Sequence, residues 1–98
     1  MTTPVGRAPT HPGEVFEEEW RKPIGISQAE AARRMKMSAN RLNEVILGRR
    51  AVSPETAVLF GKLTDTSAEM WARMQADYDV WHARKKLRVN VKCIFALR

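Results

Sequence analysis

Residues 37–50 contain the side chains best suited to recognising a ligand through short, fixed hydrogen bonds. The stretch reads MSANRLNEVILGRR and predicts a short helix whose apolar positions, Leu42, Val45 and Ile46, face inward. Its outward positions carry asparagine and other short polar groups, although lysine and glutamate would favour a solvated helix more strongly. Asparagine pairs with adenine, arginine with guanine and glutamate with cytosine, and alanine can contact a thymine methyl. The residues expected to read DNA bases are Ala39, Asn40, Arg41, Asn43 and Glu44.

A second set of polar and basic residues, at the ends of the predicted helices, is suited to phosphate oxygens. Helix N-termini attract phosphate, and Gly48 predicts a left-handed helix stop that turns the chain and presents the two arginines after it. Contacts of this kind position a protein on DNA without reading its sequence. The candidates are Gln28, Lys36, Ser38, Arg49 and Arg50. Each of them taken singly is equally well explained as a solvated side chain, and the hypothesis rests on the set.

Three of the helices that must position these residues share one start signal. A serine that can cap the helix follows an apolar residue, and a second apolar residue stands five positions after the first, as a hydrophobic staple requires. The three sets are Ile26-Ser27-Ala31, Met37-Ser38-Leu42 and Val52-Ser53-Ala57. Glu30 also stands where it can close a capping box with Ser27. A longer last helix is predicted to open at Thr66-Ser67 and to run to about Lys86.

The order of these elements predicts an all-α fold with five helices. The first helix is expected to start at Pro12, with His11 as its cap, and to end at Pro23 and Gly25. Two capped helices follow, about 28–35 and 39–47, and the three residues between them are typical of a helix-turn-helix, in which the second helix enters the DNA major groove. We predict a flexible arm (1–9), a DNA-binding and dimerisation domain (10–86) and a C-terminal tail (87–98). The tail is compatible with a strand or with a disordered extension.

The charge of the chain is clustered. The net charge is +6, and the positive charge lies in two blocks, residues 31–50 and residues 80–98. The second block holds six bases and no acid. Such blocks are typical of nucleic-acid binders, although a charged run alone is more often a solvated face. No apolar run approaches a membrane span, the N-terminus lacks the pattern of a signal peptide, and the single Cys93 has no internal partner, so a cytoplasmic protein is expected.

Neither a catalytic site nor a metal site is predicted. His11 and His82 are far apart in the sequence, and no cysteine or acid stands near them at metal-ligand spacing. The sequence contains no glycine-rich phosphate loop and no nucleophile elbow. We therefore expect a protein that binds its partners without a cofactor and is not an enzyme.

An apolar stripe on the last predicted helix suggests a second subunit. It comprises Met70, Trp71, Met74, Tyr78 and Trp81. Trp71 and Met74 are expected to pack on the domain's own core, whereas Tyr78 and Trp81 are expected to bury against another copy, because tryptophan and tyrosine are enriched in such interfaces. The alternative is that the whole stripe packs within one chain. A dimer would place two recognition helices one DNA turn, ~34 Å, apart on a palindrome.

Three segments together resemble the HigA/VapI family of antitoxins, within the Xre/Cro-like helix-turn-helix class. They are HPGEVFEEEW, GISQAEAARRMKMSANRLNEVILGRRAVSPETA and MWARMQADYDVW, between His11 and Trp81. The resemblance implies a five-helix, lambda-repressor-like fold and a homodimer that binds its own operator, at the nucleoid. It also implies neutralisation of a RelE-like, mRNA-cleaving toxin. The chain departs from the family where Lys36 and Asp65 replace glycines.

Two alternative functions stay open at this stage. One is a stand-alone Xre-type transcriptional regulator without a toxin partner. The other is a protein-interaction inhibitor whose helix-turn-helix has lost useful affinity for DNA. Acidic residues on the first helix are one possible docking site for a basic toxin, although a solvated helix face is favoured; they are Glu14, Glu17, Glu18 and Glu19.

Overall fold

The computed structural model describes residues 7–95, and helices are the only regular secondary structure within these residues. Most of the predicted arm 1–9 and the last three residues of the predicted tail lie outside the described residues. The elements are α1 (Pro12–Phe16), η1 (Glu17–Arg21), α2 (Lys22–Ile24), α3 (Gln28–Met35), α4 (Ala39–Ile46), α5 (Pro54–Thr64) and α6 (Ala68–Lys86). Since α1, η1 and α2 follow one another without a break, they form one helix. The predicted all-α fold with five helices is confirmed.

Serine caps begin four of the five helices, as the sequence predicts. The hydroxyl oxygens of Ser27, Ser38, Ser53 and Ser67 each accept a hydrogen bond, 3.0–3.1 Å long, from the backbone N–H three residues later. The capping box predicted at Glu30 is not formed. Its carboxylate is bound instead by Arg33 and Arg34, one turn further along α3, and these two guanidinium groups lower the pKa of Glu30 to about 2.

The first helix is expected to end at Pro23 and Gly25; the stop at Gly25 is confirmed, whereas the helix passes through Pro23. It continues to Ile24 and stops at Gly25, which has a φ of 89°. Directly before Pro23 the helix widens into the π turn η1, in which the N–H of Lys22 donates to the carbonyl of Glu17. A proline ring clashes with the preceding turn of a regular α-helix. We attribute the passage through Pro23 to this wider turn.

Left-handed residues end three of the other helices. Gly48 has a φ of 75°, which confirms the predicted stop after α4. Lys36 and Asp65 both have a φ of 57°, so the chain keeps the left-handed turn at the two positions where the resemblance implies glycine. This conformation costs a residue with a side chain roughly 1 kcal/mol. The short turn between α3 and α4 is therefore formed at a small cost in stability.

An aromatic cluster joins α1, α5 and α6. The rings of Phe16 and Phe60 stack at 4.2 Å between centroids, and Trp71 meets Phe60 edge to face at 5.2 Å. The indole N–H of Trp71 donates to the hydroxyl of Thr66 over 2.8 Å, so its polar atom is satisfied. All three rings are fully buried. The expectation that Trp71 belongs to the domain's own core is confirmed.

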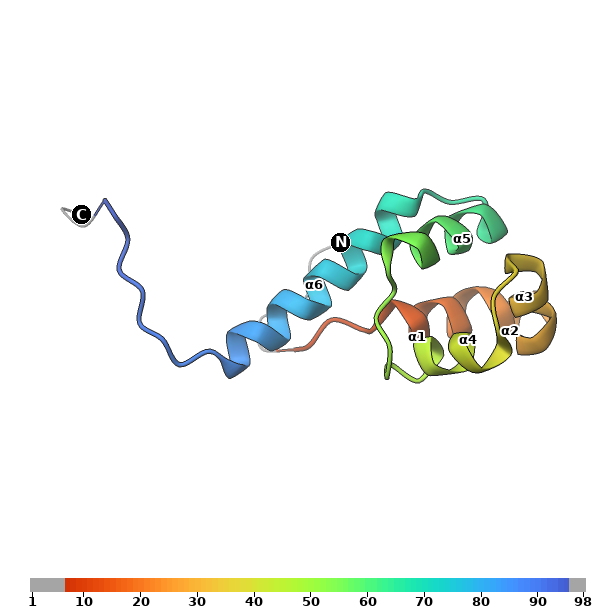
Figure 1. Cartoon of the computed structure of the whole chain (residues 1–98), viewed down its shortest axis with the longest axis horizontal. Coiled ribbons are helices and arrows are strands. Elements are labelled where there is room, and N and C mark those ends of the chain that lie inside the picture. The colour runs from red at the N-terminus through yellow and green to blue at the C-terminus, as the bar shows by residue number, and fades with distance from the viewer. Residues whose placement is uncertain (1–6, 96–98) are drawn as a thin grey trace.

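Helix α6 extends beyond this core. Figure 1 shows its C-terminal half leaving the helical body, with residues 87–95 running further away. The chain consequently measures 56 Å along its longest axis and 23 Å along the other two. Residues 87–95 form neither helix nor strand in the single chain. Among the described residues, no helix is both long and apolar enough to cross a membrane.

Gly13 allows α1 and α4 to approach closely. A Cβ atom added at this position would lie 1.9 Å from the backbone carbonyl oxygen of Val45. The atoms in conflict belong to the backbones of α1 and α4, which cannot move aside as the end of a flexible side chain can. The sequence gives no direct sign of this requirement, because glycine near a helix start is also common for other reasons.

Gly13→Ala should destabilise the fold by roughly 1–3 kcal/mol, through the steric overlap with α4. The sign of the change in unfolding free energy is informative, because alanine is more favourable than glycine in an α-helix by about 1 kcal/mol. Without the steric overlap, Gly13→Ala would therefore stabilise the protein. Thermal denaturation followed by circular dichroism measures the change. Glu14→Ala, at the exposed neighbouring position, is the control and should have the smaller effect; a stabilised Gly13→Ala variant would contradict the close approach.

His11 caps α1, as the sequence predicts. Its buried Nδ1 accepts a hydrogen bond of 2.9 Å from the N–H of Gly13, and its ring meets the ring of Tyr78 edge to face. Burial lowers the pKa of His11 below its ordinary 6.5, and Asp79 and Glu14 oppose this shift only in part. The folded protein therefore favours the neutral ring, which alone can accept at Nδ1.

The His11 cap should make stability depend on pH below about 6.5. Because the folded chain binds this proton more weakly than the unfolded chain, its contribution is complete above pH 6.5 and is lost as the pH falls toward the lowered pKa. The loss should approach that of a helix cap, ~1 kcal/mol. Urea denaturation from pH 8 to pH 5 measures it, and His11→Asn, which caps without titrating, should show a smaller loss. Equal losses in the two proteins would exclude His11 as the cause.

Candidate nucleic-acid interface

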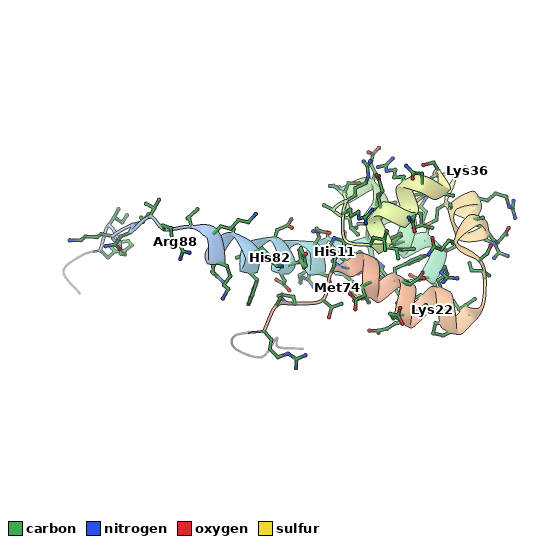
Figure 2. The ribbon with its side chains drawn as sticks, turned by 90° about the horizontal axis from the view of Figure 1, so that it is seen from below. His11, Lys22, Lys36, Met74, His82 and Arg88 are labelled. Atoms are coloured by element: carbon green, nitrogen blue, oxygen red, sulfur yellow. The ribbon has the colours of Figure 1, made fainter. Side chains whose placement is uncertain are left out.

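Helices α3 and α4 are joined by residues 36–38 alone. The left-handed Lys36 turns the chain, the N–H of Met37 donates to the carbonyl of Ala32 over 3.0 Å, and Ser38 then caps α4. Figure 2 shows Lys36 at this turn, at the edge of the helical body away from Lys22. The turn therefore fixes where α4 begins, and with it the direction in which its first residues point.

The orientation of α4 is the one that the sequence predicts. Leu42 and Val45 are completely buried and Ile46 nearly so. Of the five candidate base-reading residues, Ala39 and Asn40 are exposed, and the other three (Arg41, Asn43, Glu44) are half-buried. The exposed N-terminal end of α4 is thus free to approach another molecule. Whether these residues read bases stays a prediction.

Glu44 has a partner that the sequence analysis missed. Its Oε1 accepts from both Nε and Nη2 of Arg50, over 3.0 and 2.7 Å. The backbone carbonyl of Glu44 also accepts from the N–H groups of Arg49 and Arg50, over 2.9 and 3.3 Å. Spacing rules for helices do not reveal this pair, because its members are six residues apart and the turn at Gly48 brings them together. Reading cytosine with Glu44 would require the pair to open.

The two arginines after Gly48 consequently differ. The guanidinium of Arg50 is held by Glu44, whereas within residues 7–95 Arg49 forms no ion pair and its side chain is exposed. Arg41, on α4 itself, has a buried Nε without a hydrogen-bond partner among these residues. Of the three, Arg49 is the one fully available to an anion.

Gln28 lies in a network that joins the first helix to α3. Its Nε2 donates to Oε2 of Glu17 over 3.3 Å. Glu17 is buried and is held by Arg21 through Nε and Nη2, over 2.5 and 2.6 Å, and Nη1 of Arg21 donates to the carbonyl of Ile26. The hydrogen bond from Arg21 is the main cause that lowers the pKa of Glu17. A phosphate contact by Gln28 stays a prediction and would have to coexist with this bond.

This network also corrects the interpretation of the acidic face of the first helix. Glu17 is neither solvated nor available to a toxin, because it is buried against Arg21. The spacing of four between them was the signal for an ion pair. Glu14, Glu18 and Glu19 are exposed, and Glu18 pairs with Lys22 over 2.7 Å.

Gln75 fixes the loop that follows α4. Its Oε1 accepts from the N–H of Val52 over 2.7 Å, and its Nε2 donates to Asp79 over 2.9 Å. The side chain is buried, so these bonds satisfy polar atoms that have little access to water. Helix α6 thereby holds the end of the loop that carries Arg49 and Arg50. Sequence reasoning gave Gln75 no role, although a polar residue within an apolar helix face is a signal of this kind.

Tyr78 and Trp81, the predicted dimer residues, are half-buried within the single chain. Tyr78 packs between His11 and His82, with ring centroids 4.9 and 4.3 Å away. Trp81 contacts His82 on one side, and Lys85 lies over its ring. Both residues therefore keep part of their surface exposed on the projecting part of α6. Among the described residues, no group of three histidine, cysteine or acidic side chains could hold a metal.

Two capped helices joined by a three-residue turn, the second held by its apolar side, define a helix-turn-helix protein. A helix-turn-helix family model matches residues 18–71. The chain is 32% identical over 95 residues to virulence-associated protein I of Dichelobacter nodosus, covering 93% of this chain and 88% of that protein.

Two solved structures from Pseudomonas aeruginosa are similar to this one. Antitoxin HigA with the higBA promoter is 31% identical with a TM-score of 0.81, covering 88% of this chain and 98% of that chain. A protein in complex with its 28-bp operator DNA is 35% identical with a TM-score of 0.75, covering 79% of this chain and 85% of that chain. The chain belongs to the HigA/VapI family of helix-turn-helix proteins.

Proposed function

We propose that the protein is the antitoxin of a toxin–antitoxin module and a dimeric repressor of its own operon. The observation that carries the DNA-binding half is the N-terminal end of α4, where Ala39 and Asn40 are exposed while Leu42 and Val45 lock the opposite side into the core. Similarity to an antitoxin solved with a promoter and to a protein solved with its operator supports the same function. Repression would follow from occupation of a palindromic operator by two copies, in the cytoplasm at the nucleoid.

Base reading and backbone contact are assigned to different residues in this proposal. Asn40 is exposed at the first turn of α4, where a short side chain reaches a base edge and pairs bidentately with adenine. Lys36 precedes α4 in the chain and Arg49 follows it; both side chains are exposed and would contact phosphates. Glu44 would keep Arg50 in place until DNA binds. The protein would act by binding alone, without catalysis.

Asn40→Ala should weaken binding to the protein's own promoter DNA by ~1–3 kcal/mol and relax the preference at one base position. The loss arises because alanine cannot form the two hydrogen bonds to the base. Fluorescence anisotropy with a promoter fragment and its single-base variants measures both effects.

Arg49→Ala is the matched comparison for this measurement. It should weaken binding to all DNA sequences alike and flatten the dependence of log affinity on log salt by about one, because it removes one phosphate contact. Arg73→Ala removes the same charge from an exposed position on α6 and should leave the slope unchanged. If Asn40→Ala and Arg49→Ala both bind like the parent protein, the assignment of α4 is wrong.

The antitoxin half is tested with the product of the adjacent gene. If that product is a RelE-like nuclease, as the proposal requires, co-expression should yield a stable complex with it and should restore growth to cells in which it is toxic. Charge reversal of Glu14 and Glu19 together tests the exposed acidic face as the docking site, with Glu69→Lys on α6 as control. Operator binding without any such partner would favour the stand-alone regulator instead.

A further inference from the structure

Two neighbouring arginines after α4 leave the same turn of the backbone but differ in their charge partners. The N–H groups of Arg49 and Arg50 both donate to the backbone carbonyl of Glu44, over 2.9 and 3.3 Å. The guanidinium of Arg50 is bound by the carboxylate of Glu44, whereas Arg49 is exposed and forms no ion pair within residues 7–95. A single carboxylate therefore distinguishes the two positive charges.

The loop that carries these arginines is fixed at both ends. Gly48, at its start, has a φ of 75° and lies against the ring of His11, because a Cβ atom added there would be 3.7 Å from Cγ of that ring. At its end, the N–H of Val52 donates to the buried side chain of Gln75 over 2.7 Å. The charge that this loop presents is therefore changed more easily by the side chain of Arg50 than by the backbone.

The pair between Glu44 and Arg50 is one that a competing anion can open. Nε and Nη2 of Arg50 both donate to the same carboxylate oxygen, Oε1, over 3.0 and 2.7 Å. The strongest arginine–carboxylate pairs instead form two parallel bonds to two oxygens. The side chains of Arg50 and Glu44 are 51% and 36% exposed, and ion pairs so accessible to water contribute little net free energy. A phosphate can therefore replace Glu44 as the partner of Arg50.

Glu44 lies on α4 one turn after Asn40. Residues four apart are neighbours on a helix surface, so a molecule that contacts the exposed Asn40 also approaches the carboxylate of Glu44. Arg41, three residues before Glu44, is a second possible partner for that carboxylate. Within residues 7–95 these two form no ion pair, and the buried Nε of Arg41 has no hydrogen-bond partner. The negative charge of Glu44 is balanced by Arg50 instead.

We propose that Glu44 is a specificity-determining residue, because it keeps Arg50 from binding phosphate on any DNA whose major groove α4 does not enter. This inference rests on the proposed function and deepens it, since it gives Glu44 a role beyond a base contact. On unmatched DNA, Arg50 stays on Glu44, and of the two arginines only Arg49 contacts the backbone. On the operator, α4 lies in the groove, and Arg50 exchanges Glu44 for a phosphate.

The free-energy cost of releasing Arg50 differs between these two complexes. Release leaves the carboxylate of Glu44 beside DNA, where the phosphates repel it. In the major groove, the amino group of a cytosine can donate to this carboxylate and offset the repulsion. The phosphate backbone offers no such donor, because its oxygens only accept hydrogen bonds. The exchange is therefore favourable only where the base sequence supplies a donor.

The salt dependence of DNA binding tests this difference, because the slope of log affinity against log salt counts phosphate contacts. Glu44→Gln keeps the size of the side chain but removes the charge that holds Arg50. On a duplex of shuffled sequence it should steepen the slope by about one for each bound copy and strengthen binding ~3-fold or more in ~50 mM salt. On the promoter fragment the slope should stay unchanged, so the preference for the promoter should fall. Fluorescence anisotropy over a salt series measures all four affinities.

Variants of the two arginines show whether Glu44 acts through Arg50. Arg50→Ala should flatten the slope on the promoter but not on the shuffled duplex, whereas Arg49→Ala should flatten it on both. In the double variant Glu44→Gln/Arg50→Ala, the steeper slope on shuffled DNA should disappear. Glu69→Gln removes a carboxylate from an exposed position on α6 and should leave both slopes unchanged.

Three results would overturn the role of Glu44. They are an unchanged slope for Glu44→Gln on shuffled DNA, equal flattening of both slopes by Arg50→Ala, and a steeper slope that persists in the double variant. If the parent protein prefers its promoter and any of these occurs, only this inference is wrong. A parent protein without any preference for its promoter would overturn both this inference and the proposed function.

Discussion

Leu42 and Val45 are completely buried, and their contact with the core determines which side of α4 faces outward. Every candidate base-reading position follows from that orientation, because side chains on a helix are fixed relative to one another. Helices α1 and α3 both contact α4. The contact with α1 needs Gly13, where a side chain would meet the carbonyl of Val45. A glycine with no functional group thus helps to place the candidate base-reading residues.

Carboxylates in this structure position arginines that surround the helix-turn-helix. Glu17 is buried and binds Arg21, which in turn holds the carbonyl of Ile26 just before α3. Glu44 binds Arg50 near the C-terminal end of α4, where both side chains have access to water. The buried pair lies within the first helix, and its further bonds to Ile26 and Gln28 link that helix to the start of α3, so it would be costly to break. The exposed pair contributes little to stability and can open when an anion competes for the arginine.

Helix α6 serves the domain and, in the proposed function, the dimer. Its first half supplies Trp71 to the aromatic core and Gln75 to the loop after α4. Its second half projects from the body and leads into a tail with exposed apolar side chains, among them Leu87, Val89 and Val91. The same helix would therefore connect the interface between two copies to the loop that carries Arg49 and Arg50.

The sequence by itself determined most of the helices and the orientation of α4. Serine caps and apolar spacing are local signals, because a cap bonds within its own first turn and a helical face depends only on residues three and four apart. The left-handed stop at Gly48 was equally local.

Only the tertiary structure decided how these elements meet. Glu44 reaches Arg50 because the chain reverses between them, and Gln75 reaches Val52 across 23 residues. Burial of Glu17 and the steric need for glycine at position 13 depend on neighbouring elements, which no local pattern encodes. The continuation of the first helix through Pro23 was missed for a related reason, since a π turn lets a helix pass a residue that normally ends it.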